Sequence, residues 1–530
     1  MKPMRLIPTA ALAGCVLLAL AACGTNPVTG KRELQFVSTS QEISIGQQNY
    51  APMKQSEGGD YAVLPDLSAY ISEVGKRLVA RDDAILQKDR NLPFEFTVLN
   101  NSVPNAWALP GGKIAVNRGL LTALDNEAEL AAVLGHEITH ALARHGAQAQ
   151  ERGTLLQGGL VAAQIGAVMG GVDEQAAGLL LGGASVGAQL VHMKFGRDDE
   201  LEADQYGTRL MKAAGYDPQG AVTLQQTFVR LFDNKEPGWL EGLFASHPPS
   251  VERVRRNQEL VAQLGAGGDL GRDRFQARMK PLLAIKPAYD KYDQALAAVE
   301  KKDMARAKSL AAEAARQEPR EAQFQQLLGD IAVSEKRDLD ALAFFQKAQQ
   351  LNPNYFGSWL GGGVAQYRLN NKTVAKQWLQ RSYDLLPTAP AALYLGNISR
   401  DAGNTDAALG FYQAAASSGN AYGRDAQREA VLIDLPRRPG NYVTTQAVRD
   451  LSGKLLLKVQ NRAPVAVAGI AVTPIVVNAA GQVTNTGRTV NVRGTLDSGQ
   501  QVTVDAGLGV LTEEQEKMLR FRVESARVVE

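Results

Sequence analysis

A 34-residue interval in the second half of the chain restricts the fold more than any other feature. Prolines and small residues recur at this spacing: Pro319, Pro353 and Pro387, and Ala307, Ala341 and Ala375. Repeats of 20–50 residues are typical of stacked helix pairs, because one pair cannot bury its apolar face alone. A fourth unit fits with a shift of one residue. We therefore predict an α-solenoid over residues 288–421 whose concave face binds peptide or a partner protein.

The repeat period is that of tetratricopeptide repeats, and the chain changes character on both sides of the array. After the linker 436–440, alternating and β-branched residues separated by Gly turns predict a β-sandwich over residues 444–530. Before the array, helical patterns dominate residues 41–265, and a small sheet is expected between Pro93 and Asn117. The predicted architecture is multidomain and mainly α, with a small sheet and a C-terminal β-sandwich.

The pentapeptide from His136 to His140 carries the main chemical signal. Positions i and i+4 share one face of a helix, so both imidazoles can reach one metal ion while Glu137 faces the water that this ion activates. Asn126 with Glu129 resembles a capping box at the start of this helix, and Gly146 is expected to follow its end.

A second acidic segment, Glu200 to Asp204, supplies the missing ligand. Glu200 is our third zinc ligand, although Glu202 is an alternative in the same segment. Glu200 is favoured because Asp204 then lies one turn further on the same face, where it can accept the second N–H of a ligand histidine. Two imidazoles, one carboxylate and an open position are what one catalytic Zn²⁺ requires, with Glu137 as general base.

The first residues predict export and a lipid anchor. Lys2 and Arg5 precede a short apolar run, and small residues stand before Cys23. We therefore expect a lipoprotein signal peptide over residues 1–22, lipidation of Cys23, a polar tether over 23–40, and a periplasmic protein anchored to the outer membrane. Without Lys2 and Arg5 the basic and acidic residues balance, so a nucleic-acid partner is not expected.

Residues 146–187 form an unusual Gly-rich insert that is poor in charge. Three interpretations remain open for it: a mobile lid, a surface resting on lipid, and a closely packed helical hairpin. His145 is five residues beyond His140, which turns it away from the metal face of a continuous helix. We expect structural roles for His145 and His192.

Four segments together resemble the HtpX-like group of gluzincin metalloproteases: His136 to His140, Glu200 to Asp204, Asn105 to Gly112, and Ser246 to Arg253. A lipoprotein protease followed by tetratricopeptide repeats is similar to the BepA-like proteases of the bacterial envelope. The C-terminal β-domain departs from that arrangement, so no role is carried over to it.

The resemblance implies further roles. The strand from Gly112 to Asn117 would lie beside the cleft and pair with substrate backbone, which gives broad sequence tolerance. His247, in a Pro-Pro loop, would be a fourth zinc ligand that withdraws as a switch, although helix capping or packing is an equal alternative. Arg253 would stabilise the oxyanion, or form a surface ion pair.

The sequence thus predicts a zinc metalloendopeptidase that cleaves unfolded or misassembled envelope proteins. The repeats would recruit substrate or dock the enzyme to an outer-membrane assembly machine. The alternative is an envelope chaperone or assembly adaptor in which the repeats act and proteolysis is incidental.

Overall fold

The computed structural model describes residues 23–87, 90–151, 195–236, 238, 240, 242–265 and 267–529. It divides into two compact units, residues 1–362 and 363–530, which are described separately below. The predicted signal peptide, His192 and most of the Gly-rich insert lie outside the described residues. No helix in the described part of the chain is long and apolar enough to cross a membrane.

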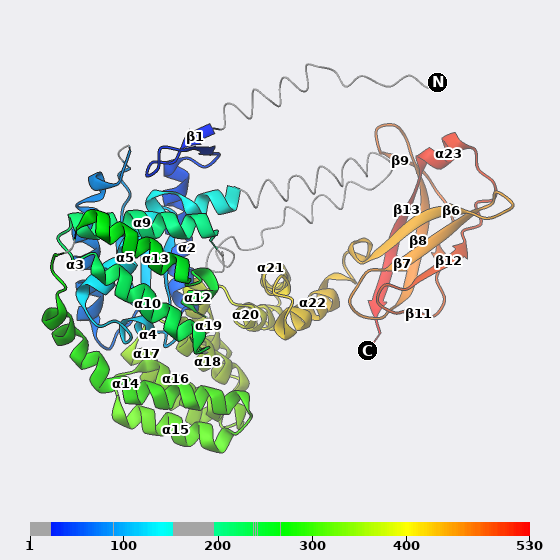
Figure 1. The fold of residues 1–530 in the computed structure, drawn as a ribbon. Helices are drawn as coiled ribbons and strands as arrows, with labels where there is room; N and C mark the ends of the chain where they lie inside the picture. Colours follow the sequence, from blue (N-terminus) through cyan, green and yellow to red (C-terminus); the bar gives the residue numbers. More distant parts are fainter. Residues whose placement is uncertain are drawn as a thin grey trace, which may run out of the picture. The chain divides into compact units, whose positions relative to one another are not determined.

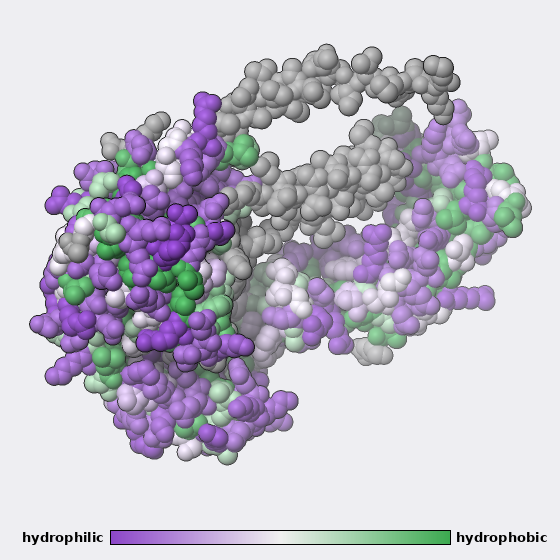
Figure 2. All heavy atoms as spheres, in the orientation of Figure 1, coloured by the Kyte–Doolittle hydropathy of each residue, from purple (hydrophilic) through white to green (hydrophobic). Residues whose placement is uncertain are grey.

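Among the described residues, eight helices, a three-stranded sheet and a short hairpin form the first part of the N-terminal unit (Figure 1). The helices are α2 (Thr39–Ser56), α3 (Pro65–Val79), α4 (Arg118–Leu121), α5 (Glu127–Leu142), α9 (Arg197–Ala213), α10 (Gln219–Asp233), α12 (Leu243–Ser246) and α13 (Val251–Leu264). Helix α5 is buried along its whole length and packs against α3, α9 and α10, while α13 packs against α9 and α10. On the visible face of this unit hydrophilic residues predominate (Figure 2).

The sheet has the order β3 (Glu95–Leu99), β5 (Lys113–Asn117), β4 (Ala106–Leu109). Strand β3 is parallel to β5 and β4 is antiparallel to it. The strand expected to receive substrate, 112–117, is therefore the central strand, and both of its edges are occupied. That prediction was wrong because β4 was not recognised as a strand. It is β4 that packs beside α5 and forms an edge of the sheet.

Residues 23–34 are not the free polar tether that we expected. They form an antiparallel hairpin of β1 (Cys23–Thr25) and β2 (Arg32–Leu34). Val28 in its loop is fully buried in the main hydrophobic cluster of the unit. The polar composition misled us because Asn26 is satisfied within the fold: its amide oxygen accepts hydrogen bonds from the N–H groups of Val28 and Thr29.

Helix α5 starts as predicted and ends earlier than predicted. The Asn126 side chain accepts from the Glu129 N–H at the N-cap. The helix stops at Leu142, because Arg144 adopts a left-handed conformation with φ of 65°. A non-glycine residue rarely does so. Ion pairs of the Arg144 guanidinium with Glu42 and Glu151 offset this strain.

Nine helices follow within residues 272–434, and their small residues recur at the predicted spacing. They are α14 (Arg272–Glu300), α15 (Met304–Gln317), α16 (Ala322–Ser334), α17 (Asp338–Leu351), α18 (Phe356–Arg368), α19 (Lys372–Leu385), α20 (Ala389–Asp401), α21 (Thr405–Ala416) and α22 (Ala421–Asp434). The recurring small residues Ala307, Ala341 and Ala375 are fully buried between helices. The chain therefore contains helical repeats.

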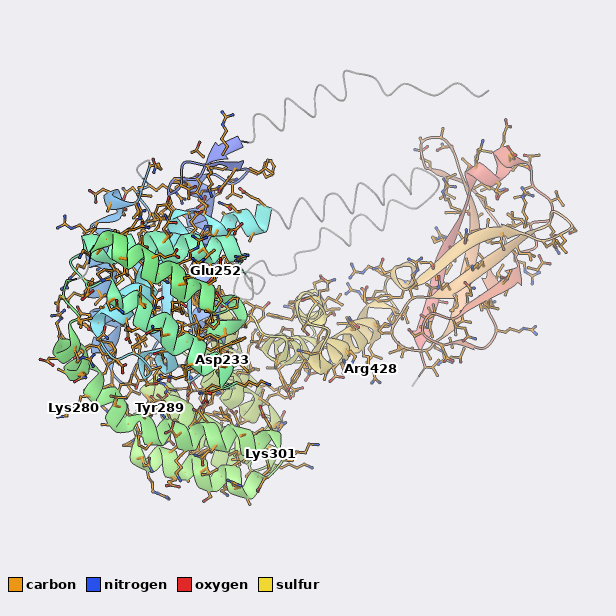
Figure 3. The ribbon with its side chains drawn as sticks, viewed as in Figure 1. Asp233, Glu252, Lys280, Tyr289, Lys301 and Arg428 are labelled. Atoms are coloured by element: carbon orange, nitrogen blue, oxygen red, sulfur yellow. The ribbon has the colours of Figure 1, made fainter. Side chains whose placement is uncertain are left out.

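The first repeat helices share the core of the preceding helices. Phe275, Tyr289 and Phe324 belong to the same buried cluster as Val28 and α5. Tyr289, labelled on α14 in Figure 3, donates a hydrogen bond to Glu321, which also accepts from Asn100 near the end of β3. Residues 272–324 are thus part of the body that carries α5.

The C-terminal region contains two antiparallel sheets. Their strands are β6 (Val443–Arg449), β7 (Leu455–Asn461), β8 (Val467–Val477), β9 (Val483–Thr486), β10 (Val490–Asn491), β11 (Thr495–Leu496), β12 (Gln501–Asp505) and β13 (Leu519–Val528), with α23 (Glu513–Met518) before the last. One sheet has the order β12-β7-β6, and in the other β8 pairs with β9, β10, β11 and β13. The sheets share one buried cluster. We predicted a β-sandwich here, but within the described residues the two sheets do not close into one. The short strands β9 to β11 pair with β8 only at separate points, which leaves that sheet irregular.

Candidate metal centre

Two glycines allow the helices that carry the predicted ligands to approach closely. A Cβ on Gly207 of α9 would lie 2.7 Å from the backbone carbon of Gly135 and 2.8 Å from the backbone nitrogen of His136. No other residue fits this contact without moving backbone. The approach brings the imidazoles on α5 next to the carboxylates on α9, which are 60 residues further along the sequence numbering.

Four buried side chains converge at this crossing: His136, His140, Glu200 and His247. One ligand atom from each lies within 4.8 Å of all the others. The Nε2 atoms of His136 and His140 are 3.0 Å apart, and carboxylate oxygens of Glu200 lie 3.5 and 3.4 Å from them. Ligands of a tetrahedral zinc ion at about 2.0–2.1 Å are about 3.3 Å from one another. The donor set and its spacing therefore fit a metal ion of this kind.

Of the two candidate carboxylates, it is Glu200 that the structure places with the imidazoles. Glu202 lies on another side of α9, with one oxygen 3.3 Å from His145 Nε2. Burial alone would raise the pKa of Glu200, but the positive charge of Arg253 and the adjacent imidazoles hold it well below its usual range. This shift favours the ionised carboxylate, the form that a metal ligand requires.

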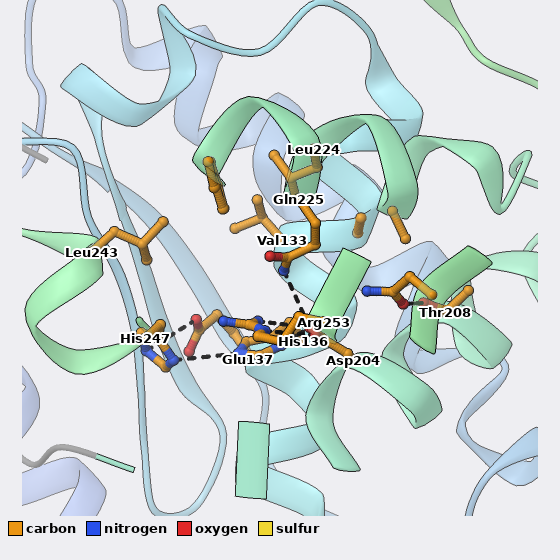
Figure 4. Close-up of a pocket in the computed structure, with 14 residues that line it drawn as sticks. Val133, His136, Glu137, Asp204, Thr208, Leu224, Gln225, Leu243, His247 and Arg253 are labelled. Carbon is orange, nitrogen blue, oxygen red and sulfur yellow. Dashed lines mark hydrogen bonds and ion pairs between the residues drawn. The ribbon is translucent and has the colours of Figure 1, made fainter. Parts of the chain in front are cut away.

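His247 lies in the loop directly after α12 and points into the same cluster (Figure 4). Its Nδ1 is 3.3 Å from His136 Nε2 and 2.8 Å from a Glu200 oxygen. Its Nε2 is 3.7 Å from a Glu137 oxygen. The imidazole is only 4% exposed. It thus stands between the proposed base and the other three ligand side chains.

Glu137 is a buried carboxylate with unused hydrogen-bonding capacity. Its Oε2 atom has no hydrogen-bond partner among the described residues. Burial raises the pKa of Glu137, and only part of this effect is offset by the neighbouring imidazoles. A buried acceptor without a donor is unfavourable for folding, so its presence beside a candidate metal centre points to chemistry.

Asp204 and Arg253 form a second layer behind His136. Asp204 Oδ1 lies 2.9 Å from His136 Nδ1, which leaves Nε2 of that ring facing the cluster. Arg253 donates from Nε and Nη2 to the two oxygens of Asp204, and its Nη1 is 2.8 Å from Glu200 Oε2. Arg253 is buried, so the alternative of a surface ion pair does not apply. Its charge outweighs the effect of burial and lowers the pKa of Asp204.

Sequence reasoning missed two residues that contact His140. The Phe195 ring stacks on the His140 ring, with centroids 4.1 Å apart. His145, for which only a structural role was expected, is buried with its Nδ1 2.8 Å from His140 Nδ1. The only sequence signal for Phe195 was its position just before α9. Residues of α5, α10 and α13 complete the pocket, among them Val133, Leu224 and Asn257.

Parts of the chain are similar to known proteins. Residues 65–261 match the model of peptidase family M48. The chain is 29% identical to a beta-barrel assembly-enhancing protease of Yersinia pestis, over 59% of this chain and 67% of that protein. It is 35% identical to the mitochondrial metalloendopeptidase OMA1 of Schizosaccharomyces pombe, over 45% of this chain and 66% of that protein. A solved TPR protein of Thermus thermophilus covers 39% of this chain and 97% of its own, with a TM-score of 0.25 and 16% identity.

Proposed function

We propose that this chain uses one zinc ion to cleave unfolded or misassembled proteins of the bacterial envelope. Its residues 65–261 belong to peptidase family M48, and the chain is a metalloendopeptidase. The observation that carries the metal assignment is the distance between the ligand atoms of His136, His140 and Glu200. It is close to the distance between two ligands of one zinc ion. The likeness to a beta-barrel assembly-enhancing protease supports the envelope role.

Each residue has one task in this proposal. His136, His140 and Glu200 hold zinc, which supplies a polarised substrate carbonyl and a water of lowered pKa. With zinc bound, Glu137 would be placed to take a proton at its unpartnered Oε2 and to return it to the leaving amine. No side-chain nucleophile takes part.

Asp204 and Arg253 act behind the ligands. Asp204 accepts the Nδ1–H of His136 and so fixes the tautomer that presents Nε2. Three of the Arg253 donor atoms already engage Asp204, Glu200 and the Pro248 carbonyl. We therefore assign Arg253 to holding the two carboxylates, in place of the oxyanion role that we had considered.

The free edge of β4 is the surface for substrate backbone. Asn117 donates its N–H to the Asn105 carbonyl, so in the antiparallel register the backbone groups of Ala106 and Ala108 point away from β5. Ala106 is fully buried and Ala108 is partly exposed, so an extended peptide would add as a strand beside Ala108. Such pairing recognises backbone more than side chains, which suits an enzyme for unfolded proteins.

His247 would regulate access to the metal. An imidazole that serves as a fourth ligand takes the position that the reacting water needs. We propose that His247 occupies this position at rest and withdraws when substrate enters. His247→Ala should then raise the basal rate on unfolded casein; a lower rate with normal zinc content and folding would contradict the switch.

The remaining regions direct the enzyme to its place of action. The helical repeats, which we assign as tetratricopeptide repeats, would dock substrate or the outer-membrane assembly machinery. Cys23 would carry lipid and hold the protein in the periplasm at the outer membrane. Cys23→Ser should move the protein from the membrane fraction to the soluble fraction, and mass spectrometry showing an unmodified N-terminus elsewhere would contradict the anchor.

Metal analysis combined with a proteolysis assay tests the central proposal. His136→Ala, His140→Ala and Glu200→Ala should lose bound zinc, whereas Glu137→Gln should keep zinc and lose casein cleavage. Stoichiometric zinc in Glu200→Ala would overturn the ligand set. In cells, full function of Glu137→Gln would favour the chaperone or adaptor role over proteolysis.

A further inference from the structure

A chain of hydrogen bonds leads from the rear of His140 to the N-terminal hairpin. His140 Nδ1 and His145 Nδ1 are 2.8 Å apart. On the other side of its ring, His145 Nε2 is 3.3 Å from Glu202 Oε1. That same oxygen accepts a hydrogen bond of 3.1 Å from the amide of Asn26. The chain joins α5, the turn after it, α9 and the loop between β1 and β2.

The donors in this chain can point in only one direction if His140 binds metal through Nε2. A neutral ligand imidazole then carries its proton on Nδ1 and donates to His145 Nδ1. His145 must therefore be protonated on Nε2, and this N–H donates to Glu202, which as a carboxylate can only accept. Each donor in the chain thus faces an acceptor, and Glu202 Oε1 accepts from both His145 and Asn26.

Asn26 is itself rigidly held. Its Oδ1 accepts from Val28 and Thr29, while its amide also donates to Glu33, at 3.1 Å. Asn26 is 1% exposed and Val28 is fully buried. The hairpin therefore presents a fixed donor to Glu202.

We propose that His145, Glu202 and Asn26 are positioning residues that set the orientation of the His140 imidazole, so that the N-terminal hairpin is a working part of the metal centre. This inference rests on the proposed function, because it requires His140 to be a ligand. His145 is the residue that makes the connection, since its imidazole accepts from His140 on one side and donates to Glu202 on the other. The Phe195 ring restrains the face of His140, and His145 restrains its rotation within the ring plane.

The zinc dissociation constant of the full chain, measured by competition with a chromophoric chelator, tests the proposal. Loss of such a partner typically weakens metal binding about 10- to 100-fold, and we expect this for His145→Ala. His145→Asn supplies an amide oxygen that can accept from His140 in place of Nδ1, so it should recover most of the lost zinc affinity. Asn26→Ala leaves His145 in place and should weaken binding by about threefold, less than the loss of the direct partner.

A matched control comes from Gln148, which lies in the helical residues after His145. Gln148 hydrogen-bonds Glu33 of the same hairpin and the Ala143 carbonyl, but it is outside the chain to His140. Gln148→Ala should leave the zinc dissociation constant unchanged. Thermal unfolding of each metal-free variant separates loss of fold from loss of orientation.

The outcomes separate this inference from the ligand assignment. Weaker zinc binding in His145→Ala, rescue by Asn and an unchanged metal-free melting temperature would support it. Wild-type affinity in His145→Ala, or an affinity loss that Asn does not rescue and that follows a lower melting temperature, would overturn it. Wild-type zinc affinity in His140→Ala would instead remove His140 as a ligand, and the proposed function would fail first.

Discussion

Glu137 and Glu321 are two buried carboxylates in the same unit with opposite surroundings. Both are almost fully buried, and burial raises the pKa of each. Glu321 accepts from the Asn100 amide, the Gln323 N–H and the Tyr289 hydroxyl, so both of its oxygens have partners. Glu137 Oε2 has none among the described residues. Equal burial therefore does not distinguish Glu137, the proposed catalytic carboxylate, from Glu321, whereas the remaining hydrogen-bonding capacity does.

The largest expected effect is the loss of activity in Glu137→Gln. Removing a general base typically lowers the rate about 10²- to 10⁴-fold, so kcat/KM for an unfolded substrate should fall by this factor. Zinc content and the melting temperature should be unchanged or higher, because no hydrogen bond to Oε2 is lost. A clear drop in melting temperature would make Glu137 structural and end the contrast with Glu321.

Glu321→Ala should show the reverse effect, a loss of stability without a loss of activity. It leaves the buried Asn100 amide and Tyr289 hydroxyl without their acceptor, which should lower the free energy of unfolding by about 2–4 kcal/mol. Chemical denaturation of the zinc-bound protein measures this loss, and Glu321→Gln provides a milder control. At a temperature where the variant is folded its kcat should match wild type; a selective loss of kcat would link the repeats to catalysis.

Gly207→Ala should affect both stability and metal binding, since it separates α5 and α9, the two helices on which the metal centre depends. The new Cβ meets backbone atoms of Gly135 and His136, and overpacking of this kind typically costs about 1–3 kcal/mol. We expect lower stability together with weaker zinc binding. Gly410→Ala, within α21 and with nothing within 4 Å of the added Cβ, is the matched control and should be neutral or slightly stabilising. Normal zinc affinity in Gly207→Ala would show that the centre tolerates helix movement.

The smallest effect concerns Glu127, a third buried carboxylate of the same unit. Burial would raise the pKa of Glu127, but hydrogen bonds from Arg274, Tyr70 and Tyr216 outweigh it and lower the pKa. Its stabilisation is therefore present above pH 4.5, the ordinary value, and is lost as the pH falls through the lowered value. Glu127→Gln should remove about 1 kcal/mol at neutral pH and flatten the acid limb of a stability curve. An unchanged acid limb would contradict this.

Local spacing predicted much of this molecule. The pairing of repeat helices follows from a period that leaves Ala307 and Ala341 between helices. The grouping of His136, His140 and Glu200 follows from the helix period once both helices are identified. In these cases the determining contacts are between residues close in the sequence or on one face of one helix.

Contacts between residues far apart in the chain could not be predicted from the sequence. His145 would face away from the metal on a continuous helix, and only the left-handed conformation of Arg144 turns it back towards His140. That conformation depends on ion pairs with Glu42, which is distant in the sequence, and with Glu151, which lies beyond the end of α5. The packing of Asn26 against Glu202 likewise joins residues 176 positions apart. Composition cannot reveal such partners, so the hairpin was mistaken for a tether.

The shared core of the repeats and the preceding helices has a consequence for synthesis. Val28 and Phe324 lie in one buried cluster, so the body that carries the metal centre cannot close until the ribosome has added α16. Contacts between such distant residues also slow folding. A nascent or truncated chain that contains the pentapeptide but lacks residue 324 has an incomplete core. We therefore expect proteolytic activity to appear only after the repeat region has begun to form, and fragments that end before residue 324 to be inactive.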